Sequence, residues 1–299
     1  MSNKLLLSVI VVLLITNVAT MLLWKNDRSD ESIVEDEEVD TQKPVASIGG
    51  TEISFQDWMK SLRESYGKKE LKTLIDQEVV KKLAQEQNIT VSEKVIERDI
   101  ALLTTMQGLT TEEELKELEE NWREDIIYRY QLEAMLAQDV QVPEEDVQAY
   151  FTKYDNQYQF SESFQLSHIL VANRETANKV YEELEAGASF SLLAKEYSID
   201  EDTRENGGYL GFNSSSTEFI PSNYFDIAKG LEEYTYSEPF VTSNGVAILF
   251  LHKKLPDITF SYEELKPYIR NELALQSINQ NLVADPLWEK FDIEWVYDE

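Results

Sequence analysis

The chain has 299 residues, of which 42% are hydrophobic, so its length suffices for two domains with apolar cores. Its formal net charge of -30 has the opposite sign to a nucleic-acid-binding surface and argues against nucleic-acid partners. With no cysteine and two histidines, the sequence excludes disulfides and a lipid-modified cysteine, and it leaves too few ligands for a thiolate or multi-histidine metal site. We therefore expect no metal and no other cofactor.

An uncharged apolar segment runs from Leu5 to Trp24. As a helix it would be about 30 Å long, which matches the hydrocarbon core of a membrane. We interpret residues 1–25 as an uncleaved signal-anchor. A cleaved signal peptide and a buried helix are the alternatives, although Asn17-Val18-Ala19-Thr20 fits a small-x-small cleavage site poorly. With this single span, we expect a single-pass protein of the cell membrane whose bulk is extracytoplasmic.

The next segment, residues 26–44, is rich in acidic residues and poor in hydrophobic ones. Such a segment buries too little apolar area to offset the entropy of ordering, and its like charges repel one another. We predict a disordered acidic linker. Cation binding at a cell wall is the alternative role.

Helical periodicity dominates residues 45–160, after a short hairpin predicted around Gly49-Gly50. Ser54 is a candidate helix N-cap, and Thr111 with Glu114 forms a predicted capping box. We found no nucleophile, metal or phosphate motif in this region. Its predicted core residues begin with Leu71, Leu74, Ile75, Val79 and Leu83.

Residues 256–299 are also predicted to be helical, with a capping box at Ser261 and Glu264 and a proline, Pro267, near the helix start. The apolar tail needs a partner surface, and the first helical region is the simplest one. One helical domain is therefore predicted from two separated segments. Homodimerisation stays possible, although no heptad repeat is sustained. The tail residues are Trp288, Phe291, Ile293, Trp295 and Val296.

Residues 161–255 change character and predict an inserted α+β domain with an antiparallel sheet. Its first strand carries His168 on the same face as Phe164, Leu166 and Leu170. A histidine among hydrophobic residues has two interpretations. It is either a hydrogen-bonded core residue or part of a site.

Several motifs of this domain follow one another in a recognisable order and spacing. They resemble parvulin-type peptidyl-prolyl cis/trans isomerases. The helical flanks extend the resemblance to PrsA-type extracytoplasmic foldases with a SurA-like helical chaperone domain. The motifs are Ser167-His168-Ile169-Leu170-Val171, Tyr197-Ser198-Ile199-Asp200, Gly207-Gly208-Tyr209-Leu210-Gly211, Glu238-Pro239-Phe240-Val241 and Gly245-Val246-Ala247-Ile248.

The resemblance implies an α+β protein with a helical chaperone domain and an inserted isomerase domain. It also implies the positions of the site residues. His168 and Asp200 are the expected catalytic residues. The expected substrate-binding residues are the proline cup and a position before the last strand: Leu210, Ile220, Tyr224 and Asn244.

Four positions depart from the family pattern. Ala247 stands where the family has a second histidine, which implies that His168 lacks its usual ring partner. Tyr209 replaces a common aspartate in the glycine motif. In the cup, Ile220 and Tyr224 replace methionine and phenylalanine.

The implied function is isomerisation of X-Pro bonds in unfolded or partly folded exported polypeptides. The alternative is a weakly catalytic or non-catalytic chaperone scaffold, which Ala247 favours. A hydrolase built on His168, Asp200 and some serine would need a nucleophile motif, and we found none.

Overall fold

The computed structural model describes residues 40–214, 220–278 and 281–297. The chain divides into two units, residues 1–70 and 71–299, each of which we describe by itself. Among the described residues, no helix has the length and apolar character needed to cross a membrane. The predicted anchor, residues 1–25, and residues 26–39 of the predicted linker lie outside the described residues.

The first unit contains the predicted hairpin and one helix. Strand β1 (Pro44–Ile48) pairs antiparallel with β2 (Thr51–Ser54). Helix α2 (Phe55–Leu62) follows, and a π-helical turn (Arg63–Gly67) connects it to α3. The Ser54 side chain accepts a hydrogen bond from the backbone N–H of Asp57, which confirms the predicted N-cap.

The helical part of the second unit comes from both ends of the described chain. Its capping box at Thr111 and Glu114 is present as predicted. Pro143, a residue type that also suits the first helical position, is the N-cap of the helix that begins at Glu144. The helices are α3 (Lys68–Gln87), α4 (Glu93–Thr105), α5 (Glu112–Ala137), α6 (Glu144–Tyr154), α10 (Tyr262–Ile278) and α11 (Asp285–Trp288).

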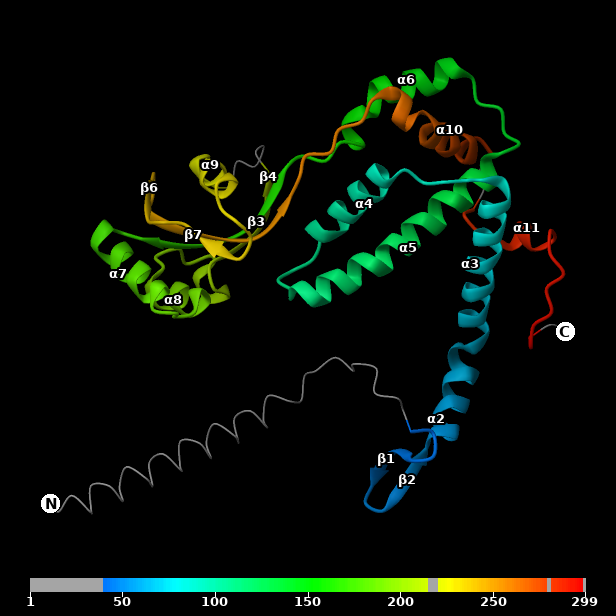
Figure 1. The fold of residues 1–299 in the computed structure, drawn as a ribbon, viewed down its shortest axis with the longest axis horizontal. Coiled ribbons are helices and arrows are strands. Elements are labelled where there is room, and N and C mark those ends of the chain that lie inside the picture. The colour runs from blue at the N-terminus through cyan, green and yellow to red at the C-terminus, as the bar shows by residue number, and fades with distance from the viewer. Residues whose placement is uncertain (1–39, 215–219, 279–280, 298–299) are drawn as a thin grey trace. The chain divides into compact units, whose positions relative to one another are not determined.

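The C-terminal segment packs on the first helical segment, as the apolar tail predicted. Helix α10 contacts α5 and α6, and Figure 1 shows α10 beside α6. Leu287 and Phe291 share an apolar cluster with Val80 of α3 and Leu132 of α5. One helical core is therefore built from two chain segments.

The chain passes from the helical core to the inserted segment once and returns once, and these two connecting segments pair with each other. Phe160 and Ile258 form an antiparallel bridge, with N–H to O=C distances of 2.9 and 2.8 Å. Both residues are buried in one apolar cluster with Val95, Leu265 and Ile269. The insertion thus leaves and re-enters the helical core at a single point.

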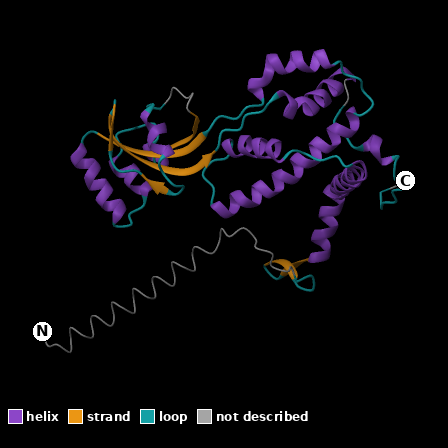
Figure 2. Ribbon diagram, turned by 45° about the horizontal axis from the view of Figure 1, so that its top comes forward, coloured by secondary structure: helices purple, strands orange, loops and turns teal. Residues whose placement is uncertain are grey.

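The inserted segment forms an antiparallel sheet with strand order β4-β3-β7-β5, and β6 pairs with β7 as well (Figure 2). Strand β3 (Ser163–Val171) pairs with β7 (Gly245–Leu255) along its whole length. All nine residues of β3 are buried. The other strands are β4 (Tyr209–Ser214), β5 (Thr235–Tyr236) and β6 (Phe240–Thr242).

Helices cover both faces of this sheet, which explains why β3 is apolar on both sides. Helices α7 (Arg174–Glu185) and α8 (Phe190–Tyr197) pack against Ile169 and Val171. Helix α9 (Asn223–Lys229) packs against Leu170 through Tyr224 on the opposite face. The alternation predicted for the first strand is therefore confirmed.

The glycine motif is required by a close backbone approach. Gly208 has φ +77°, and a Cβ there would lie 1.9 Å from the carbonyl oxygen of His168. The His168 N–H also donates to the Gly208 carbonyl at 2.8 Å. Gly211 has a similar φ of +73°, but a Cβ there would meet nothing within 4 Å.

These two glycines form a matched pair for a stability test. Gly211→Ala should cost about 1 to 2 kcal/mol, because it adds only the strain of a left-handed backbone. Gly208→Ala should cost about 3 kcal/mol or more, because strand β4 must also move away from β3. Urea unfolding of the full-length chain measures both losses. Equal losses would contradict the close approach.

Candidate active site

The site is organised around the buried ring of His168, which is 6% exposed. Both ring nitrogens have partners. Nδ1 lies 2.8 Å from the hydroxyl of Tyr224, and Nε2 lies 2.8 Å from Oδ2 of Asp200. Thr203 Oγ1 lies 3.2 Å from Nε2 and also donates to Asp200 Oδ2. The ring thus connects α9 to the loop after α8.

Electrostatics fix the charge states of this cluster. Burial lowers the pKa of His168, and Asp200 offsets that effect only in part. For Asp200, burial opposes ionisation, but hydrogen bonds from Thr203 and His168 outweigh it and lower the pKa. Burial raises the pKa of Tyr224. Near neutral pH the cluster therefore holds a neutral imidazole, a carboxylate and a protonated phenol.

The loop that carries Asp200 is held against β3 by hydrogen bonds to the backbone of Leu170. The Ile199 N–H donates to the Leu170 carbonyl at 2.8 Å. In return, the Leu170 N–H donates to the hydroxyl of Ser198 at 3.3 Å, and the Asp200 N–H donates to the same hydroxyl. These bonds hold the carboxylate, whose side chain is 23% exposed, at the more open end of the ring.

The predicted cup residues lie on the same face of the sheet as His168. Leu210 and Ile220 are partly buried and pack on the cluster that contains Leu170, Tyr224 and Leu249. Tyr224 itself is 1% exposed, and its ring stands edge-on to that of His168 at 5.8 Å between centroids. Leu210 and Ile220 are thus the accessible part of the apolar wall, and Tyr224 is its base.

Two predicted features lie apart from the ring. Asn244 is exposed in the turn between β6 and β7, where its N–H donates to Thr242 Oγ1. None of the hydrogen bonds found in the described part of the chain joins it to His168 or Asp200. Ala247 pairs with Leu170 in the sheet, whereas His168 pairs with Leu249. The Tyr224 hydroxyl, not a residue of β7, is the partner of His168 Nδ1.

Sequence reasoning missed two residues of this region. Thr203 is a further partner of both His168 Nε2 and Asp200 Oδ2, and its place three residues after Asp200 was the available signal. His252, the second histidine, lies on β7 with Nε2 2.8 Å from Ser167 Oγ, and it was not considered as a partner of β3.

Comparison with known proteins identifies the region that holds this site. The family model of the PPIC-type PPIase domain matches residues 142–267. YacD of Bacillus subtilis, whose name assigns it provisionally as a peptidyl-prolyl cis-trans isomerase, is 34% identical over 256 residues, which cover 85% of this chain and 86% of YacD. The chain belongs to the PPIC-type peptidyl-prolyl isomerase family.

The isomerase has further relatives among foldases. Foldase protein PrsA of Halalkalibacterium halodurans is 29% identical over 85% of this chain and 77% of its own length. The crystal structure of PrsA from Bacillus cereus is 27% identical, covers 87% of this chain and 95% of that chain, and has a TM-score of 0.31. The parvulin resemblance predicted from the sequence motifs is therefore confirmed at the level of the family.

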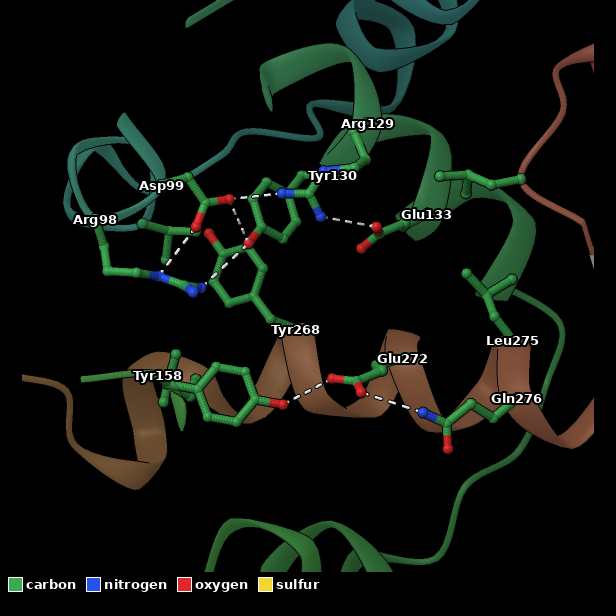
Figure 3. A pocket seen from close by; sticks show the side chains of 13 residues that line it. Arg98, Asp99, Arg129, Tyr130, Glu133, Tyr158, Tyr268, Glu272, Leu275 and Gln276 are labelled. Atoms are coloured by element: carbon green, nitrogen blue, oxygen red, sulfur yellow. Dashed lines mark hydrogen bonds and ion pairs between the residues drawn. The ribbon is translucent and has the colours of Figure 1, made fainter. Parts of the chain in front are cut away.

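The isomerase also has a pocket of about 580 Å³ in its helical part, between α4, α5 and α10 (Figure 3). Arg98 and Arg129 share the carboxylate of Asp99, with nitrogen-to-oxygen distances of 3.0 and 2.6 Å. On the facing wall, Tyr158 donates to Glu272 at 2.7 Å. Nε of the buried Arg98 is within ion-pair distance of Asp99, but it has no hydrogen-bond acceptor among the residues that the structure describes. The pocket therefore combines aromatic walls with a guanidinium that keeps donor capacity.

His252 gives the folded isomerase a distinct pH dependence. Burial lowers the pKa of His252 to about 4, whereas a histidine in an unfolded chain titrates near about 6.5. Between these values the unfolded chain binds a proton that the folded chain does not bind. Stability should therefore fall as the pH falls from about 6.5 to about 4.

The variant His252→Gln keeps a polar group for Ser167 but removes the titration. Between about pH 7 and pH 4.5, the wild type should lose about 1 to 2 kcal/mol more stability than the variant, a figure reduced to allow for partial exposure of the ring. Urea unfolding at both pH values tests this. Identical pH dependence in the two proteins would show that His252 is not held neutral.

Proposed function

We propose that this isomerase catalyses cis/trans isomerisation of X-Pro bonds in unfolded or partly folded exported polypeptides, acting as a foldase outside the cytoplasmic membrane. We assign catalysis to residues 161–255 and client holding to residues 45–160 and 256–299. Residues 1–25 would anchor the chain to the membrane, and residues 26–44 would serve as the linker. The similarity to foldase proteins PrsA supports the role in folding.

One observation carries the catalytic assignment. The buried ring of His168 lies on the same sheet face as the partly accessible apolar wall of Leu210 and Ile220, and the carboxylate of Asp200 is hydrogen-bonded to the more open end of that ring. A proline ring is apolar and fits such a wall. The amide that precedes it would then lie near the polar end of the site, which Asp200 provides.

The reaction needs no covalent chemistry, only a lower rotation barrier than the uncatalysed ~18–20 kcal/mol. Rotation breaks the conjugation of the amide, so the carbonyl oxygen becomes less negative in the transition state than in either planar state. A fixed carboxylate close to that oxygen destabilises the planar states more than the twisted one. Each factor of ten in rate requires only about 1.4 kcal/mol of such a difference.

The variant Asp200→Asn tests this role because it removes the charge and preserves the shape. Exchange of X-Pro bonds in short peptides, measured with the full-length chain, should be catalysed by the wild type. The variant should lose about tenfold or more in kcat/KM, since the preorganised charge is gone.

Glu201→Gln is the matched control, because Glu201 is the exposed acidic neighbour in the same loop. It should leave kcat/KM unchanged. No acceleration by the wild type over buffer would refute the enzymatic proposal. An equal loss in both variants would refute the specific role of Asp200.

The helical pocket supports a second function, the holding of client chains. Its lining includes Leu275 and Gln276 as well as Tyr158, so both apolar and polar groups of a peptide would find contacts. Leu275→Trp, which fills the pocket, should weaken suppression of client aggregation and leave short-peptide isomerisation intact.

Ile278→Trp on the same helix is the control, since Ile278 is 43% exposed and lies outside the pocket lining. This variant should behave as the wild type in both assays. Equal suppression by all three proteins would place client holding elsewhere on the chain.

A further inference from the structure

We propose that the hydroxyl of Tyr224 is a positioning group for catalysis, and that it fixes the tautomer and orientation of His168 by donating a hydrogen bond to Nδ1. This inference deepens the proposed isomerase function and rests on it. The ring of Tyr224 belongs to the proline-cup pattern, and the resemblance assigns nothing to its hydroxyl, because phenylalanine is common there.

The direction of each hydrogen bond follows from the chemistry of the partners. Asp200 is held as a carboxylate and can only accept, so Nε2 of His168 must carry the proton. Nδ1 of the neutral ring is then an acceptor. Tyr224, whose pKa burial raises, remains protonated and donates to it at 2.8 Å. A single arrangement satisfies all three groups.

The burial of Tyr224 means that its hydroxyl needs a hydrogen-bond partner. Tyr224 is 1% exposed and belongs to an apolar cluster with Leu170, Ala247 and Leu249. A phenol in such a place costs free energy unless it is hydrogen-bonded, and no other partner of this hydroxyl is found among the described residues. A phenylalanine would fill the same space without that cost. The hydroxyl is therefore explained by its bond to His168.

Ala247 explains why this donor is needed here. A small apolar side chain at that position, fully buried and opposite Leu170, offers no polar contact to the imidazole. Without Tyr224, Nδ1 would be an unsatisfied buried acceptor. The ring could then adopt the other tautomer, in which Nε2 no longer donates to Asp200, and the carboxylate would lose one of its two side-chain donors.

Tyr224→Phe removes only the hydroxyl and keeps the ring that forms the base of the apolar wall. Because the chain has two histidines, selective ¹⁵N labelling gives four ring-nitrogen signals for the full-length protein. In the wild type, Nδ1 of His168 should resonate as a hydrogen-bonded acceptor and Nε2 as a protonated nitrogen. In the variant, the Nδ1 signal should move towards that of a free acceptor nitrogen, and the two His252 signals should stay in place.

Tyr209→Phe is the matched control. The Tyr209 hydroxyl accepts from Gln165 at 2.9 Å, and its ring contacts His252 instead of His168. This variant should leave the His168 signals and catalysis unchanged. It therefore separates loss of a hydrogen-bonded phenol hydroxyl in the same domain from loss of the specific donor to Nδ1.

Kinetics of X-Pro exchange complete the test. In Tyr224→Phe, kcat should fall about tenfold with KM unchanged. The apolar wall is intact in this variant, and only the fixed orientation of the His168 imidazole is lost. Unchanged kcat, or a wild-type Nδ1 that carries a proton, would overturn the proposal. A wild type without activity would refute the proposed function instead, and the ¹⁵N signals would still decide whether Tyr224 fixes the tautomer.

Discussion

Burial of one imidazole imposes the conditions that shape the catalytic region. A buried histidine requires a partner at each ring nitrogen, and the two partners of His168 come from different parts of the chain, Asp200 and Tyr224. The loop after α8 and helix α9 must therefore approach the central strand from separate sides. Gly208, which has no side chain, allows the start of strand β4 to lie against the backbone of His168. The fold of the insertion is thus arranged around the needs of one side chain.

The pairing of the two chain crossings allows this region to be inserted without opening the helical core. The antiparallel bridge between Phe160 and Ile258 satisfies the backbone groups of both crossings within an apolar cluster. The insertion is therefore joined to the helical core by two chain segments that pair with each other. This explains how α10 can pack on α5 and α6 although the whole catalytic region separates them in sequence.

Much of this architecture could be predicted because it depends on local patterns. The hairpin at Gly49-Gly50, the cap at Ser54 and the capping box at Thr111 each use residues that are adjacent or three apart. The inserted arrangement followed from the apolar tail, which needed a partner surface. Pro143 shows the limit of such rules, since proline suits both the cap and the first helical position, and the sequence does not separate them.

The connections within the site could not be predicted, because they depend on convergence of distant segments. Thr203 meets His168, and Tyr224 meets the opposite nitrogen, only after β3, α8 and α9 have packed. The resemblance placed Tyr224 in the proline cup but implied nothing about its hydroxyl. It also implied that Ala247 leaves His168 without a ring partner, whereas the structure puts the Tyr224 ring edge-on to it. His252 was missed because no motif carries it.

The cluster has the same kinds of group as a hydrolytic triad, namely a carboxylate, an imidazole and a hydroxyl, but its geometry suits a different reaction. A triad needs an exposed hydroxyl that gives its proton to the imidazole and then attacks the substrate. The hydroxyl of Tyr224 is buried, its pKa is raised, and its phenol ring is held within the apolar cluster. The more exposed end of the chain of hydrogen bonds is the carboxylate of Asp200, not the hydroxyl.

Rotation about an X-Pro bond transfers no proton, so it is compatible with an imidazole that stays neutral and a phenol that stays protonated. The burial that would disable Tyr224 as a nucleophile also holds the His168 ring in place, and that ring donates one of the hydrogen bonds that keep Asp200 ionised.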